Sequence, residues 1–291
     1  MSGWKSWVAA VGLIAAVASA QTGVSGTPKG AGTPDGVNGH YGPPACATER
    51  AATYRDRVAK AHREQEEGAD TPHALVSAEP LRNLDIERYR IEDYANCVGT
   101  HGCYWADLDT QYKRAEAALA IEVKRHKPGE RLAIVFDIDE TVLSKFCQMP
   151  VENYGYLQKM DDEWTLSAQG LPIPGALRLF NEAKADGVAV FFITGRPGVP
   201  RADAVHPRED QTEATERNLE AAGFHGWAGL ALKNHDENGM KVIPYKSLER
   251  KKIEDKGYRI VMSVGDQWSD LEGAPQAEVS VKLPNPFYFI E

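Results

Sequence analysis

Residues 131–141 read RLAIVFDIDET, an apolar run that leads straight into a group of acids. Five consecutive apolar residues, Leu132 to Phe136, are typical of a strand that is buried on both faces. Asp137 follows at once, and Asp139 and Glu140 come directly after it. The pattern predicts a central strand of a parallel sheet, with carboxylates at the point where the strand ends.

The rest of the second half of the chain repeats this alternation. Further apolar runs lie at residues 188–193, 228–232 and 258–264, and stretches typical of helices lie at residues 174–186, 209–222 and 246–256. Strands that alternate with helices predict an α/β fold with a parallel sheet and right-handed crossovers. In such sheets the ligand site lies beyond the carboxyl ends of the strands.

Polar residues follow three of the four predicted strands. Asp137 and Asp139 follow the first, Thr194 ends the second, and Asp266 and Asp270 follow the last. One aspartate of the first pair can attack as a nucleophile, and the other can donate a proton if burial and a like charge raise its pKa. The remaining acids beside Asp137 would form an oxygen-rich site suited to Mg²⁺. Taken singly, each group could also be an ordinary turn or helix cap.

A phosphate site with several carboxylates also needs a cation besides the metal. Lys246 opens the helix before the last long strand, and Lys233, at the end of the weaker strand, competes with it. Position alone leaves this choice open.

Together these segments resemble the phosphatases of the haloacid dehalogenase (HAD) superfamily. DIDET at 137–141, TGR at 194–196, a lysine, and GDQWSD at 265–270 occur in the order of its four signatures. The stretches YKS at 245–247, GYRI at 257–260 and LPNP at 283–286 are similar to secreted class B acid phosphatases and plant vegetative storage proteins. The resemblance covers about residues 85–291 and implies a Rossmann-like α/β fold.

The resemblance also implies roles for individual residues. Asp137 would attack phosphorus, and Asp139 would protonate the leaving oxygen and then activate water. The substrate-binding residues would be Ile138, Thr194, Gly195 and Lys246, and the Mg²⁺ ligands would be Asp137, Asp139 through its backbone carbonyl, Asp266, and Asp270 through water.

The N-terminal half differs in character. Residues 1–20 carry Lys5, an apolar run and an Ala-Ser-Ala cleavage site, which predict a signal peptide. Residues 21–44 are rich in Gly and Pro and indicate a flexible leader. Residues 45–130 read as a helical extension, with an irregular part that contains short helical pieces at 70–104, and residues 131–291 read as the phosphatase core. A short cap insertion is expected at about 145–172, where Phe146, Tyr154, Tyr156 and Trp164 could stack on a substrate or simply pack over the sheet.

Export would place the chain in an oxidising compartment, either periplasmic or extracellular. The four cysteines allow three pairings. We prefer Cys97 with Cys103, which enclose a short loop, and this leaves Cys46 with Cys147. A zinc site that uses His101, between Cys97 and Cys103, is the competing interpretation.

The predicted function is therefore a secreted, Mg²⁺-dependent acid phosphatase that acts on small phosphomonoesters. The alternatives are a selective 5′-nucleotidase or phosphotransferase on the same site, or a non-catalytic storage or phosphate-binding protein. A net charge of −9 argues against binding to duplex nucleic acid. No membrane partner is expected after signal cleavage, and the pattern leaves the oligomeric state open.

Overall fold

The computed structural model describes residues 41–44, 46, 81, 83–98, 102–201 and 207–290. The predicted signal peptide, most of the leader and the charged helical stretch at 49–67 lie outside the described residues. No helix in the described ranges is long and apolar enough to cross a bilayer.

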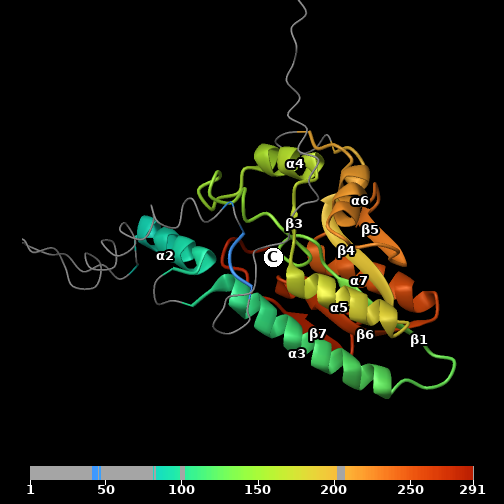
Figure 1. The fold of residues 1–291 in the computed structure, drawn as a ribbon. Helices are drawn as coiled ribbons and strands as arrows, with labels where there is room; N and C mark the ends of the chain where they lie inside the picture. Colours follow the sequence, from blue (N-terminus) through green and yellow to red (C-terminus); the bar gives the residue numbers. More distant parts are fainter. Residues whose placement is uncertain are drawn as a thin grey trace, which may run out of the picture.

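The centre of the fold is a five-stranded sheet in the order β5-β4-β1-β6-β7, with all neighbours parallel (Figure 1). The strands are β1 (Arg131–Phe136), β4 (Ala189–Pro197), β5 (Gly229–Lys233), β6 (Tyr258–Gly265) and β7 (Val279–Lys282). The predicted α/β class is confirmed. The sequence missed only β7 in this sheet, because a strand of four residues with two exposed or half-buried polar positions leaves no apolar run.

Helices cover both faces of the sheet, as alternate side chains of each strand require. The helices are α3 (Tyr104–Lys124), α5 (Pro174–Ala185), α6 (Thr212–Ala221) and α7 (Val242–Asp255). Ile134 and Phe136 pack into the cluster that contains residues of α3 and α5, whereas Ala133 and Val135 pack against α7. Figure 1 shows α3 and α5 side by side on one face, with α7 behind the sheet.

A small insertion follows β1. The antiparallel pair β2 (Leu143–Ser144) and β3 (Leu171–Pro172) frames it, and α4 (Gln158–Ser167) lies within it. Asp162 of α4 accepts hydrogen bonds from Arg208 and from Gln211, which precedes α6. The insertion is thereby tied to the segment that follows β4, over the carboxyl edge of the sheet.

The N-terminal part contributes α2 (Leu84–Asn96) and the long helix α3. Within 70–104, where only short helical pieces were expected, α2 is a helix of 13 residues, so the expected length is wrong. Its buried positions include Glu92, Asp93 and Asn96, so no apolar stripe marks it in the sequence.

The preferred cysteine pairing is confirmed. Cys97 is bonded to Cys103, with Cα atoms 4.3 Å apart, and Cys46 to Cys147, with Cα atoms 5.9 Å apart. Since both cysteines of the proposed zinc site are used in a disulfide, the zinc interpretation is wrong. His101 lies outside the described residues.

Candidate active site

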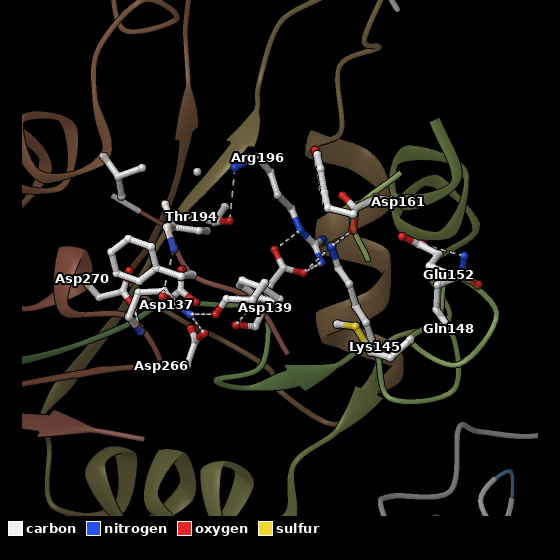
Figure 2. A pocket seen from close by; sticks show the side chains of 18 of the residues that line it. Asp137, Asp139, Lys145, Gln148, Glu152, Asp161, Thr194, Arg196, Asp266 and Asp270 are labelled. Atoms are coloured by element: carbon white, nitrogen blue, oxygen red, sulfur yellow. Dashed lines mark hydrogen bonds and ion pairs between the residues drawn. The ribbon is translucent and has the colours of Figure 1, made fainter. Parts of the chain in front are cut away.

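A cavity of about 530 Å³ opens at the carboxyl edge of the sheet. The ends of β1, β4 and β6, the start of α7 and the insertion all contribute to its wall. In Figure 2, Asp137, Asp266 and Asp270 lie together on one side, and Lys145, Gln148 and Glu152 lie on the other, with Asp139 and Arg196 between them. The arrangement brings the acids predicted at two separate strand ends, together with Thr194 from a third, into one site.

Asp137 is buried and makes a close ion pair. Lys246 Nζ lies 2.5 Å from Asp137 Oδ1 and 2.6 Å from Asp270 Oδ1. Burial raises the pKa of Asp137 to about 6, in spite of the opposing charge of Lys246. Burial also acts to lower the pKa of Lys246, but the charges of Asp137 and Asp270 outweigh it and raise that pKa. The ammonium is thus held in its charged form against the carboxylates.

Lys233 does not reach the cavity. Its ammonium donates to the backbone carbonyl of Met240, 2.7 Å away, and it is absent from the cavity wall. The structure therefore places Lys246, and not its competitor, beside Asp137.

Three buried carboxylates form a group that fits a divalent cation. One oxygen from each of Asp137, Asp266 and Asp270 lies within 4.8 Å of the others. Asp266 accepts hydrogen bonds from Asn285 Nδ2 (2.6 Å) and Gln267 Nε2 (2.7 Å). Burial and the charges of Asp270 and Asp137 raise its pKa well above the usual value. Three carboxylates beside the Lys246 ammonium leave an excess of negative charge, which a divalent cation would neutralise.

Asp139 faces a different set of partners. Arg196 donates to both of its carboxylate oxygens, at 3.0 and 2.7 Å, and Lys145 Nζ lies 3.2 Å away. Burial by itself would raise the pKa of Asp139, but the charges of Arg196 and Lys145 outweigh it and lower that pKa well below its usual range. The condition set for a proton donor, a pKa raised by burial and a like charge, is therefore not met in the resting site, because Arg196 and Lys145 outweigh the effect of burial. The side chain of Asp139 is not part of the group formed by Asp137, Asp266 and Asp270, and its backbone carbonyl accepts from the Tyr288 hydroxyl at 3.4 Å.

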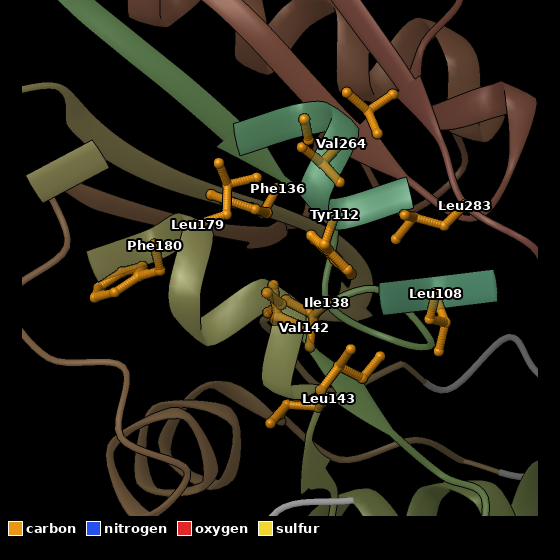
Figure 3. Packing of buried hydrophobic residues seen from close by; sticks show 14 of the residues in the cluster. Leu108, Tyr112, Phe136, Ile138, Val142, Leu143, Leu179, Phe180, Val264 and Leu283 are labelled. Atoms are coloured by element: carbon orange, nitrogen blue, oxygen red, sulfur yellow. The ribbon is translucent and has the colours of Figure 1, made fainter. Parts of the chain in front are cut away.

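The loop after β1 is held in place by packing and hydrogen bonds within the hydrophobic core. The side chain of Ile138 is fully buried, and its carbonyl accepts from the backbone N–H groups of Val142 (2.9 Å) and Leu143 (3.0 Å). Figure 3 shows Ile138, Val142 and Leu143 packed together near Tyr112 of α3. The Tyr112 hydroxyl donates to the carbonyl of Thr141, 2.6 Å away. Ile138 thus faces the core, and only its backbone could contact a phosphate.

At the end of β4, Thr194 and Gly195 line the cavity. Thr194 is buried, and its hydroxyl accepts from the backbone N–H of Arg196 at 3.3 Å. At the end of β6, a Cβ on Gly265 would overlap with the side chain of Asp270, so glycine is required for that aspartate to turn back toward Asp137.

Several residues around the site were missed or left undecided by sequence reasoning. Lys145 had no motif to mark it, and Arg196 entered the sequence analysis only as the last residue of the TGR signature. Glu140 is fully buried, where Tyr104 and Ser144 donate to it, and burial raises its pKa to about 7. Of these, only Arg196 and Glu140 lie inside the quoted signatures.

The aromatic residues expected in the cap insertion differ in their exposure and in whether they line the cavity. Phe146 and Tyr154 are buried in the hydrophobic core, whereas Tyr156 is exposed and lines the cavity. Trp164 is absent from the cavity wall. The prediction that cap aromatics could meet a substrate therefore narrows to Tyr156.

Comparison with known proteins gives one family. The family described as HAD superfamily, subfamily IIIB (Acid phosphatase) matches residues 55–291. Acid phosphatase 1 of Solanum lycopersicum is 37% identical over 160 residues, which cover 54% of this chain and 58% of that protein. The Stem 31 kDa glycoprotein of Glycine max is 36% identical over 161 residues (54% and 59%), and Vegetative storage protein 2 of Arabidopsis thaliana is 34% identical over 161 residues (54% and 56%). The match thus spans little more than half the length of these curated relatives.

Among solved structures, the class C acid phosphatase from Bacillus anthracis with tungstate bound is similar with a TM-score of 0.48 and 22% identity. The match covers 62% of this chain and 79% of that one. This likeness is too distant to support an inference about the site.

Proposed function

Since the chain belongs to the HAD superfamily, subfamily IIIB (acid phosphatase), we propose that it is a Mg²⁺-dependent acid phosphatase that hydrolyses small phosphomonoesters through an aspartyl-phosphate on Asp137. The observation that carries this proposal is the group of Asp137, Lys246, Asp266 and Asp270 at the carboxyl edge of the sheet. A nucleophile, an ammonium and an oxygen-rich cation site meet there within a few ångströms.

The charges explain why the group needs each member. A phosphate ester and the Asp137 carboxylate repel each other by about 4 kcal/mol per pair of unit charges at ~4 Å and an effective dielectric of 20. Mg²⁺, held by Asp137, the Asp139 carbonyl, Asp266 and Asp270, would neutralise part of this charge and hold the phosphoryl oxygens. Lys246 and the Thr194 hydroxyl would bind the remaining phosphoryl oxygens, and the Ile138 and Gly195 backbones would complete the binding site.

In the first step an oxygen of Asp137 forms a bond to phosphorus, and the bond from phosphorus to the leaving oxygen breaks. The charges of Arg196 and Lys145 keep Asp139 ionised in the resting site, so the proton for the leaving oxygen has to arrive with the substrate. A phosphate ester has a second pKa of about 6, and its monoanion carries a proton below this pH. That proton passes from the phosphoryl oxygen to Asp139, and from Asp139 to the leaving oxygen as the bond to phosphorus breaks. The supply of this proton falls as the pH rises through about 6, and this favours activity on the acidic side provided that bound Mg²⁺ keeps Asp137 ionised against its raised pKa.

In the second step water attacks the phosphoryl group, and the bond from phosphorus to Asp137 breaks. Asp139 accepts a proton from the attacking water and is suited to this step in its resting, ionised form. Arg196 and Lys145 hold its carboxylate in place through both steps.

The competing function is that of a non-catalytic storage or phosphate-binding protein, since the relatives include proteins named as storage proteins. The presence of aspartate at both 137 and 139 favours a working enzyme. A selective 5′-nucleotidase or phosphotransferase would use the same group of residues and differ only in the acceptor and the organic group.

Hydrolysis of p-nitrophenyl phosphate tests the proposal. We expect product release by the purified protein with Mg²⁺ and almost none with EDTA. Asp137→Asn should abolish turnover and keep the folded state, and Asp255→Asn, at an exposed ion pair on α7, is the matched control. Absence of release by the wild type under every metal condition would favour the storage alternative.

We also propose that the protein is secreted, to a periplasm or to the outside of the cell. The two disulfides support an oxidising compartment. Sequencing the N-terminus of the mature protein tests this, because a chain that still begins at Met1 contradicts cleavage of the predicted signal peptide.

A further inference from the structure

A residue with a strained backbone lies directly after the two catalytic aspartates. Glu140 follows Asp139 and has a φ of 56°, in the left-handed region that residues other than glycine rarely adopt. Such a conformation persists only where the surrounding contacts hold it. The contacts that hold Glu140 therefore also fix the peptide that joins it to Asp139.

Three donors meet at the fully buried carboxylate of Glu140. The hydroxyl groups of Tyr104 and Ser144 each donate to Oε2 at 3.0 Å, and the backbone N–H of Lys145 donates to Oε1 at 2.6 Å. Two of these donors belong to the loop itself, four and five residues after Glu140. The third, Tyr104, lies 36 residues earlier in the chain and ties the loop to helix α3.

The same carboxylate connects Tyr104 with Asp139. Lys145, whose backbone N–H is bonded to Glu140, places its ammonium 3.2 Å from Asp139 Oδ1 (Figure 2). Glu140 thus reaches Asp139 by two routes, through the peptide that joins them and through the Lys145 side chain. A shift of the Glu140 carboxylate would therefore displace the group proposed to transfer protons.

Tyr104 is itself held firmly. It is the first residue of α3 and is fully buried, and its ring packs edge-on against Trp105 and Phe287, with centroids 5.2 and 5.1 Å apart. The preceding residue, Cys103, is bonded to Cys97. The Tyr104 hydroxyl therefore has little freedom to move, as a group that positions another requires.

A second tyrosine of α3 supports the next residue of the loop. Tyr112 lies two turns after Tyr104 on the same buried face, with Leu108 between them. Its hydroxyl donates to the carbonyl of Thr141 at 2.6 Å. Phenylalanine at both positions would serve apolar packing alone, so the two hydroxyl groups point to a role in holding the loop.

We infer that Tyr104 is a positioning residue: its hydroxyl holds Glu140, and through Glu140 it keeps Asp139 in place for proton transfer to the leaving oxygen. This inference rests on the proposed function of Asp139. It gives α3 a part in the reaction although no residue of this helix lines the cavity, and although α3 lies outside the alternation of strands and helices that follows it.

Tyr104→Phe tests the inference, because it removes the hydroxyl and keeps the buried ring. Phenyl phosphate and p-nitrophenyl phosphate are compared, since they differ in how much the leaving oxygen needs a proton. Phenol has a pKa of about 10, as the tyrosine side chain does, and leaves poorly unless it is protonated, whereas the nitro group stabilises the departing anion.

We expect kcat/KM for phenyl phosphate to fall by roughly five- to fiftyfold, less than the ~10²-fold that a misplacement of about 1 Å can cause. The fall for p-nitrophenyl phosphate should be smaller, by roughly threefold or more, because its leaving group depends less on Asp139. A loss of folded protein would lower both values equally, so the ratio of the two separates positioning from stability.

Tyr94→Phe is the matched control. The Tyr94 ring lies 6.0 Å from that of Tyr104, but its hydroxyl donates to Asp107, which is not part of the cavity wall. This variant should keep the ratio of the two kcat/KM values. An unchanged ratio in Tyr104→Phe, or an equal change in Tyr94→Phe, would overturn the inference.

Hydrogen exchange gives a readout that needs no turnover. The backbone N–H of Lys145 is bonded to Glu140, and that of Glu140 to the carbonyl of Leu143 at 2.8 Å. In Tyr104→Phe both should exchange faster by roughly two- to tenfold, the factor that corresponds to the loss of one typical hydrogen bond. Unchanged exchange of both groups would also overturn the inference.

These outcomes are separate from those of the proposed function. A wild type that hydrolyses neither ester, together with faster exchange in Tyr104→Phe, keeps the hold of Tyr104 on the loop and removes the phosphatase. An active wild type whose Tyr104→Phe variant keeps both the ratio and the exchange rates does the reverse.

Discussion

Replacement of Lys246 by methionine should destabilise the protein and make its stability depend strongly on Mg²⁺. The ammonium lies within 2.6 Å of carboxylate oxygens of both Asp137 and Asp270, and its side chain is only 4% exposed. Methionine keeps much of the length and the apolar stem of lysine but removes the charge. The substitution leaves Asp137, Asp266 and Asp270 without the cation that lies between them.

The size of the effect follows from the buried geometry. Removal of one partner of a buried ion pair costs about 3–5 kcal/mol. For a domain of this size each kcal/mol lowers the melting temperature by roughly 2–4 °C, so the fall should be roughly 6–20 °C in EDTA. At the 4.8 Å limit between their oxygens, each pair of carboxylates repels by about 3.5 kcal/mol at an effective dielectric of 20. Since Mg²⁺ relieves this repulsion, it should restore more stability to the variant than to the wild type.

The assay is a thermal melt of each protein in EDTA and in Mg²⁺, together with hydrolysis of p-nitrophenyl phosphate. Lys233→Met is the matched control, because Lys233 is also a buried lysine but donates to the carbonyl of Met240. It should lose stability equally in both buffers and keep its activity, whereas Lys246→Met should lose activity by about 10²–10³-fold. The proposed role of Lys246, to neutralise the carboxylates of this site, is wrong in either of two cases. One is that Lys246→Met melts at the same temperature as the wild type in EDTA. The other is that Mg²⁺ stabilises Lys246→Met and Lys233→Met to the same extent.

Two further outcomes are expected. Gly265→Ala should weaken Mn²⁺ binding, measured by electron paramagnetic resonance, because the new Cβ displaces Asp270 from the acid group; an affinity equal to that of the wild type would contradict this. Arg178→Met should destabilise the protein by about 1–3 kcal/mol at pH 7, because Asp109, which is buried, loses an ion-pair partner at 2.7 Å. Burial acts to raise the pKa of Asp109, but the hydrogen bonds and charges of Lys113 and Arg178 outweigh it and lower that pKa, so its contribution is present above the unfolded pKa of about 4 and is lost as the pH falls below it. The difference in unfolding free energy between wild type and variant, measured in urea, should therefore shrink below about pH 4, and a constant difference from pH 7 to 3 would refute the argument.

The strand pattern made much of the fold predictable. Runs such as Leu132–Phe136 are apolar on both faces because helices cover both sides of a parallel sheet, and this leaves a signal that local sequence carries. The acids at 137, 266 and 270 could be placed together for the same reason, since parallel strands end at one edge. Elements without such a signal were predicted poorly: α2, with its buried polar residues, was expected only as short helical pieces, and the short β7 was missed.

What the sequence determined by itself was therefore the order of the strands and helices and the kinds of residue at the strand ends. Only the tertiary structure decided which charges stand next to one another. Asp139 is ionised because Arg196, 57 residues further along the chain, donates to both of its oxygens. Lys246 rather than Lys233 meets Asp137 because α7 begins at the cavity. Electrostatic and apolar contacts depend on the distance between groups in space, and this distance cannot be read from the order of residues along the chain.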